Sequence, residues 1–171
     1  VNAVEALIPK QSDHIRHILV VEEDKERGDS LVKQLLAEEL EAVRVSSAQG
    51  ALEALRRERF ACMILDLSLP DMDGLDLLQS LQEQYGAETP SVVVYTSRPL
   101  SKTEAQRVES YAEAVVLREG SSTERLLDEV RLFVRRLKAG LGPRRAATTQ
   151  ALPVSVRLEG QKILVVDDDM R

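Results

Sequence analysis

The sequence is poor in cysteine and in aromatic residues, and it has no long apolar run. Among 171 residues there are one cysteine, three tyrosines, two phenylalanines and no tryptophan. The single cysteine, Cys62, has no partner for an internal disulfide, which is typical of a reducing compartment. There is neither the run of about 20 apolar residues that a membrane helix needs nor a basic segment followed by an apolar stretch, as in a signal peptide. We therefore expect a cytoplasmic chain that makes no membrane contact.

The charge balance is acidic, with 23 lysine and arginine residues against 29 aspartate and glutamate residues. The formal net charge of -6 argues against a nucleic-acid-binding protein, because phosphate contacts need concentrated lysine and arginine. Hydrophobic residues make up 43% of the chain, which is enough to form a core. The length suits one domain with some residues left over.

Short apolar runs alternate with stretches of helical periodicity. Such runs are typical of strands that are buried on both faces of a parallel sheet, with helices covering each side. Five of them, separated by helix-length segments, predict a doubly wound α/β domain. The runs span residues 18–21, 62–65, 91–95 and 114–117, together with a weaker one at 43–45 that includes Arg44.

The segments between these runs carry helix signals. Apolar residues recur at helical spacing from Leu31 to Leu40 and from Leu75 to Leu81, and Gly86 marks an expected helix end. Two serines, each three residues before a glutamate, form capping boxes that predict helix starts at Ser101 and Ser121.

A sequence echo near the C-terminus suggests a tandem duplication. Ile-Leu-Val-Val followed by three acidic residues occurs at 18–24 and again at 163–169. A repeat at domain length indicates two copies of a domain. We expect four segments: an N-terminal extension or linker (1–15), the complete domain (16–138), a linker (139–159) and the first strand of a second, truncated copy (160–171).

Acidic, hydroxyl and basic residues follow the predicted strands. In an open parallel sheet, sites form beyond the carboxyl ends of the strands, near the switch in strand order. Glu22, Glu23, Asp66, Thr96 and Arg118 all fall at such ends. This set suits phosphorylation of a carboxylate, because a hard cation such as Mg²⁺ offsets the repulsion between the carboxylate and a phosphoryl group. A hydroxyl and a basic side chain then satisfy the phosphoryl oxygens.

The segment from Leu65 to Gly74, Leu-Asp-Leu-Ser-Leu-Pro-Asp-Met-Asp-Gly, resembles the phosphoacceptor loop of bacterial response-regulator receiver domains. The resemblance covers about residues 18–138. It implies a flavodoxin-like, five-stranded parallel sheet of order 2-1-3-4-5 with helices on both faces. It also implies that Asp66 is the phosphorylated residue, and that Thr96 and Arg118 stand at the family's hydroxyl and basic positions.

The resemblance further implies a Mg²⁺ ion held by the family's acidic pair, by the acceptor and by a backbone carbonyl. In this sequence those ligands are Glu22, Glu23, Asp66 and the carbonyl of Ser68. Ser68 also excludes a haloacid-dehalogenase-type phosphatase, which needs an aspartate at that position.

The sequence departs from the family pattern at four points near the site, one of which is Glu119 in place of the proline that follows the family's lysine. The acidic pair is Glu-Glu, although the second position is usually aspartate, and Val115 replaces an aromatic switch residue. Arg118 replaces lysine, and a planar guanidinium is not equivalent to a compact ammonium. Two interpretations of Arg118 follow: it grips a phosphoryl group with two hydrogen bonds, or it forms a salt bridge to Asp66 that blocks the acceptor.

The sequence therefore leaves two functions open. In the first, the chain is a phosphorelay receiver that is phosphorylated by a histidine kinase or a histidine phosphotransfer domain. Its expected parent is a hybrid sensor histidine kinase with tandem receivers, although no glycine-rich nucleotide-binding loop of a kinase lies in this sequence. In the second, it is a degenerate pseudo-receiver that regulates neighbours through contacts alone. A neighbouring receiver is an expected partner in either case. Whether the domain forms a dimer is left open.

Several residues near the site have structural interpretations. Asp24 is expected to cap the first helix, and Asp71 and Asp73 are expected to shape the loop after Asp66. Cys62 is expected in the core. Ser97 is an alternative to Thr96 as the hydroxyl residue.

Overall fold

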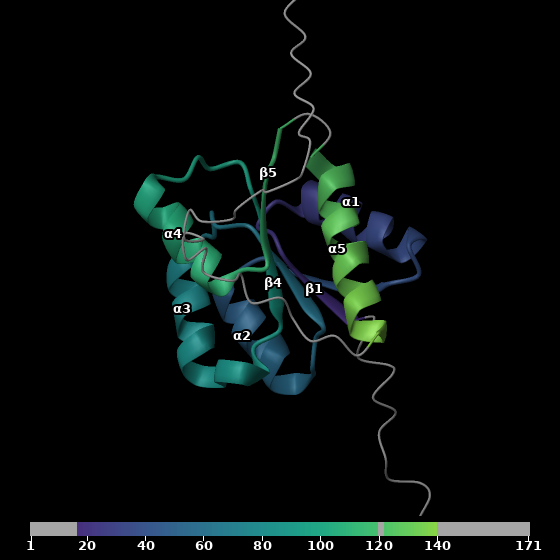
Figure 1. Cartoon of the computed structure of the whole chain (residues 1–171), viewed down its shortest axis with the longest axis horizontal. Helices are drawn as coiled ribbons and strands as arrows, with labels where there is room; N and C mark the ends of the chain where they lie inside the picture. Colours follow the sequence, from purple (N-terminus) through teal and green to yellow (C-terminus); the bar gives the residue numbers. More distant parts are fainter. Residues whose placement is uncertain (1–16, 120–121, 140–171) are drawn as a thin grey trace, which may run out of the picture.

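The computed structural model describes residues 17–119 and 122–139, where five strands alternate with five α-helices (Figure 1). The strands are β1 (His17–Val21), β2 (Glu41–Val45), β3 (Cys62–Leu65), β4 (Ser91–Thr96) and β5 (Ala114–Leu117). The helices are α1 (Lys25–Ala37), α2 (Ala48–Arg57), α3 (Gly74–Tyr85), α4 (Lys102–Tyr111) and α5 (Ser122–Lys138). The predicted N-terminal extension, the linker beyond residue 139, the second copy at 160–171 and Ser121 lie outside the described residues.

The five strands form one parallel sheet in the order β2-β1-β3-β4-β5. This confirms the doubly wound sheet and its predicted order. Strand β1 lies between β2 and β3, and Val21 at its end is in register with Leu65 at the end of β3. The switch in strand order therefore falls at the carboxyl ends of β1 and β3, where a doubly wound fold forms its crevice.

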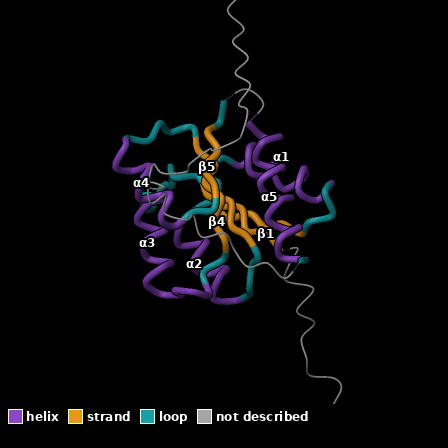
Figure 2. The backbone as a smooth tube through the Cα atoms, in the orientation of Figure 1, coloured by secondary structure: helices purple, strands orange, loops and turns teal. Residues whose placement is uncertain are grey.

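Helices cover both faces of the sheet, which lies between them as a middle layer (Figure 2). Helices α1 and α5 cover one face, and α2, α3 and α4 cover the other (Figure 1). Successive residues of β1 point to opposite faces, so Ile18 and Val20 join the core under α1 and α5, whereas Leu19 and Val21 join the other core. Burial on both faces explains why the central strands β1, β3 and β4 are apolar runs rather than alternating ones, whereas the edge strand β2 has no buried residue.

The helix starts follow the expected capping residues. The Asp24 carboxylate accepts a hydrogen bond from the Arg27 amide at 2.9 Å and caps α1. Ser101 and Glu104 form the predicted capping box of α4. The C-terminal end of α3 also follows the expected signal. Gly86 caps it with a φ of 51°, which lies in the left-handed region that glycine adopts readily.

The apolar stripe predicted for the first helix, from Leu31 to Leu40, extends beyond the end of α1. Helix α1 ends at Ala37, and the chain turns at Glu39, whose φ is 59°. Leu40 is buried, but it reaches the core from this turn, and its amide donates to the Leu35 carbonyl. Leu36 points outward and is 53% exposed, so helical spacing alone did not identify the buried face.

In the part of the chain that the structure describes, no helix combines the length and the apolar character that a bilayer crossing requires.

Candidate functional site

The sheet itself brings the predicted site residues together. Glu22, Asp66 and Arg118 each directly follow a strand, and the backbone amide of each donates to a carbonyl of the neighbouring strand at 2.9 to 3.0 Å. Thr96 is the last residue of β4. These backbone bonds extend the sheet by one residue and fix where the four side chains start, so all four lie at its carboxyl edge.

Both carboxylate oxygens of Asp66 accept hydrogen bonds, and the residue is only 3% exposed. Its Oδ1 accepts hydrogen bonds from the Thr96 hydroxyl at 2.9 Å and from the Ser68 amide at 3.2 Å. Its Oδ2 accepts from Arg118 Nη2 at 2.8 Å. Thr96 thus contacts the Asp66 carboxylate directly, whereas Ser97 contacts Arg118, whose Nη2 donates to Ser97 Oγ at 3.1 Å.

Arg118 joins the two buried carboxylates of the site. Its Nη1 lies 2.6 Å from Glu22 Oε2, while its Nη2 contacts Asp66. The guanidinium carbon lies 5.5 Å from the centre of the Tyr95 ring, within the range of a cation–π contact. The salt bridge to Asp66 that the sequence left as one of two interpretations is therefore present in this structure.

Glu22 has a second arginine partner that sequence reasoning missed. Its Oε1 accepts from Arg27 Nη2 at 2.9 Å and from the Asp24 amide at 3.0 Å. The hydrogen bond to Glu22 raises the pKa of Arg27 above its usual range. Arg27 lies in the first turn of α1, the helix that follows β1, and that position was the available signal.

These residues, as arranged here, do not fit Mg²⁺. All four carboxylate oxygens of Glu22 and Asp66 accept hydrogen bonds from protein donors, and Arg118 stands between the two groups. Glu23 is exposed. Within residues 17–119 and 122–139, no three His, Cys, Asp or Glu side chains are grouped to hold a metal ion. The metal set Glu22, Glu23, Asp66 and Ser68 stays a prediction.

The loop after Asp66 is built as expected from structural carboxylates. Asp71 accepts from the amides of Ala48 and Gln49, both at 2.9 Å, at the start of α2. Because the Gln49 amide and then the Ala48 amide stabilise its charged form, the pKa of Asp71 is lowered. Asp73 caps α3 through the Leu75 amide at 2.8 Å.

Arg98 ties this loop to the start of α4. Its two Nη atoms contact Asp73 Oδ2 and Glu104 Oε1, both at 2.9 Å. Its backbone amide donates to Thr96 Oγ1 at 3.2 Å, so the hydroxyl that binds Asp66 also holds this segment. Val115, at the family's aromatic switch position, is partly buried against the core under α2, α3 and α4.

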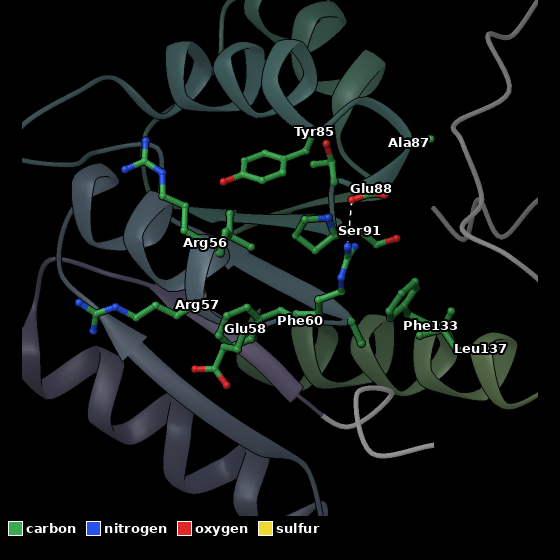
Figure 3. Close-up of a pocket in the computed structure, with 15 residues that line it drawn as sticks. Arg56, Arg57, Glu58, Phe60, Tyr85, Ala87, Glu88, Ser91, Phe133 and Leu137 are labelled. Atoms are coloured by element: carbon green, nitrogen blue, oxygen red, sulfur yellow. Dashed lines mark hydrogen bonds and ion pairs between the residues drawn. The ribbon is translucent and has the colours of Figure 1, made fainter. Parts of the chain in front are cut away.

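A separate cavity of about 620 Å³ lies at the opposite edge of the sheet (Figure 3). It is lined by the segments that lead into β3 and β4, and by Phe133 and Leu137 of α5. Arg59 and Glu88, which both line the cavity, form a salt bridge of 3.1 Å. Because these segments precede the strands, the cavity is remote from Asp66, which follows β3.

Comparison with known proteins identifies the family. The response regulator receiver domain profile matches residues 18–131. The transcriptional regulatory protein SrrA of Staphylococcus aureus is 31% identical over 123 residues, which cover 71% of this chain and 49% of SrrA. The chain thus spans about half the length of the curated relatives it matches.

Solved structures share the fold. The BeF3-activated receiver domain of Klebsiella pneumoniae RstA has a TM-score of 0.61 and 27% identity, over 70% of this chain and 98% of that one. The receiver domain of a putative Luxo repressor from Vibrio parahaemolyticus has a TM-score of 0.65 at 23% identity, over 73% and 94%. The chain therefore belongs to the response regulator receiver domain family, whose members act with a histidine kinase in two-component systems.

Proposed function

We propose that this receiver domain accepts a phosphoryl group on Asp66 from a phosphohistidine of its partner kinase or of a histidine phosphotransfer domain. The observation that carries the proposal is the placement of the Asp66 carboxylate between the Thr96 hydroxyl and the Arg118 guanidinium. These groups meet at the switch in strand order, where doubly wound folds place their sites.

The proposed transfer forms one bond and breaks one. An Asp66 oxygen attacks phosphorus, the P–N bond to the imidazole breaks, and its electron pair returns to the imidazole nitrogen, which takes up a proton. The attack requires Arg118 to move from Asp66 Oδ2 to the incoming phosphoryl oxygens, which the planar guanidinium can bind with two hydrogen bonds. The Thr96 hydroxyl then donates to the transferred group.

The larger protein in which the domain works is a separate proposal. The repeated Ile-Leu-Val-Val motif at 163–166 favours tandem receivers within a hybrid histidine kinase, with the second receiver as a neighbouring partner. SrrA, in contrast, is named a transcriptional regulatory protein. Sequencing the full reading frame tests this: a hybrid kinase predicts a histidine kinase domain in the same frame, and a DNA-binding domain in its place contradicts it.

The same site also favours a second candidate, a pseudo-receiver that works through contacts alone. Asp66 is almost fully buried, and Arg118 already satisfies its Oδ2. If the guanidinium does not leave, no phosphoryl donor reaches the carboxylate. Regulation would then depend on the surfaces of the domain.

Intact-protein mass spectrometry after incubation with acetyl phosphate separates the two candidates. The proposed acceptor gains the mass of one phosphoryl group, and Asp66→Asn abolishes the gain. Asp76→Asn is the matched control, because it makes the same chemical change on the exposed side of α3 and should leave the gain intact. Absence of any gain in the folded wild-type protein favours the pseudo-receiver.

A further inference from the structure

The guanidinium of Arg118 serves both carboxylates of the site with different nitrogen atoms. Nη1 contacts Glu22 at the end of β1, and Nη2 contacts Asp66 at the end of β3. A single ammonium group is a compact point charge, whereas the guanidinium fork presents several donors at fixed angles. The replacement of lysine by arginine therefore allows one side chain to span both acidic strand ends.

A divalent cation would need the same oxygen atoms. Mg²⁺ binds carboxylate oxygens at about 2.0–2.1 Å and requires near-octahedral geometry. Glu22 Oε2 and Asp66 Oδ2 are the oxygens that Arg118 contacts at 2.6 and 2.8 Å. The ion and the guanidinium cannot both lie between these carboxylates.

The charge of the two buried carboxylates is also largely offset without a metal. Glu22 and Asp66 face two guanidinium groups, Arg118 and Arg27, of which Arg27 also pairs with the more exposed Asp24 at 3.2 Å. The electrostatic repulsion between carboxylates that normally favours uptake of a divalent cation is thereby offset.

We infer that Arg118 excludes Mg²⁺ from this receiver by occupying the position between Glu22 and Asp66 that the ion would take. In the resting domain, arginine side chains then offset the charges of Glu22 and Asp66. Mg²⁺ binds only when Arg118 is withdrawn or replaced. The inference rests on the proposed function for its location, since it concerns the same site, and it adds how access to that site is controlled.

The surroundings of Arg118 provide both an anchor and room for withdrawal. Tyr95 and Ser97 hold the guanidinium in its present position. On the side of α1, Arg118 also lines a cavity of about 360 Å³ together with Gln34 and Thr123. Arg118 therefore borders open space on that side, into which withdrawal from Asp66 is proposed.

Calorimetric titration of the full chain with MgCl2 tests the inference. Wild type is expected to bind Mg²⁺ about tenfold or more weakly than Arg118→Met, in which the two carboxylates face each other without a cation. Added Mg²⁺ is also expected to raise the Tm of Arg118→Met and not that of wild type, because a ligand stabilises the state that binds it. Adding Asp66→Asn to Arg118→Met should abolish both effects.

Two further variants complete the test. Arg131→Met removes a guanidinium that pairs with Glu38 and Asp128 away from the site, and it should titrate like wild type. Arg118→Lys keeps the charge but loses the fork of the guanidinium. If Arg118→Met fails to fold, the Mg²⁺ affinity of Arg118→Lys relative to wild type decides the result.

Equal Mg²⁺ affinity in wild type and the Arg118 variants would overturn the inference, as would no saturable binding in either Arg118 variant. Phosphorylation is not measured in these titrations. Their failure is therefore distinct from failure of the acceptor role of Asp66, which the mass experiment decides.

Discussion

Thr96 Oγ1 lies 2.9 Å from Asp66 Oδ1, although 30 residues separate the two along the chain. The hydroxyl is fully buried, and it also accepts from the Arg98 amide. It thus connects the acceptor carboxylate to the segment that leads into α4.

Thr96→Val keeps the side-chain shape and removes this hydroxyl. We expect the free energy of unfolding to fall by about 1–3 kcal/mol, because a buried oxygen and a backbone amide each lose a partner. We also expect phosphorylation by acetyl phosphate to slow by about 10²-fold, since a donor to the transferred group is lost. Urea denaturation and the time course of the mass gain measure the two effects. Thr96→Ser, which retains the hydroxyl, should lie close to wild type, and a Thr96→Val rate equal to that of wild type would contradict the role.

Gly74→Ala should destabilise the loop that carries Asp66. A Cβ atom at Gly74 would lie 2.6 Å from Leu67 Cα, so the start of α3 would have to move away from the end of the loop. We expect a loss of about 1–3 kcal/mol in the free energy of unfolding, as for other overpacked sites. Gln79→Ala, on the exposed face of the same helix, should change it by no more than about 0.5 kcal/mol. Equal urea midpoints for the two variants would be inconsistent with this close approach.

Asp71→Ala should make the protein less stable at neutral pH and matter less in acid. The lowered pKa of Asp71 means that its contribution to stability is complete above the ordinary aspartate value of 3.8, and is lost as the pH falls through the lower value of the folded state. At pH 7 we expect a loss of about 1 kcal/mol, as for removal of a helix cap. Denaturant titrations at pH 7 and pH 3 should show the difference from wild type shrinking at the lower pH. A difference that grows in acid would have the wrong sign.

Cys62 should be inert in the folded protein. Burial in β3 raises the pKa of its thiol to about 12, so almost no reactive thiolate forms near neutral pH. A thiol reagent such as dithionitrobenzoate is expected to react slowly with the native protein and rapidly in urea. Rapid labelling of the native protein would show that β3 is not buried as described.

The fold was predictable because its strands carry a strong and simple signal. The central strands β1, β3 and β4 are mostly buried, so their apolar runs stand out from the polar helical segments around them, whereas the edge strands β2 and β5 are more exposed and carry a weaker signal. The capping box at Ser101 and the glycine at Gly86 also marked their helix ends directly. Leu40 was misplaced because a buried residue in a turn can fall by chance in the spacing of the preceding helix.

The site was predictable in most of its members and only partly in its pairing. Arg27 was missed, the predicted Glu23 is exposed, and the contact of Arg118 with Asp66 was one of two interpretations. Strand ends placed Glu22, Asp66, Thr96 and Arg118 at one edge, and the sheet brings them there. Which carboxylates Arg118 contacts depends on its side-chain rotamer, which Tyr95 and Ser97 help to fix across the site. No spacing rule along the sequence encodes such contacts.

The acceptor role of Asp66 can be tested at the level of the single residue. After incubation with acetyl phosphate, borohydride reduces an aspartyl phosphate to homoserine, and tandem mass spectrometry of the digested protein locates the change. We expect homoserine at position 66 and at no other acidic residue of the site. Homoserine homologues at Glu22 or Glu23, or unmodified Asp66 in a folded protein, would contradict this expectation.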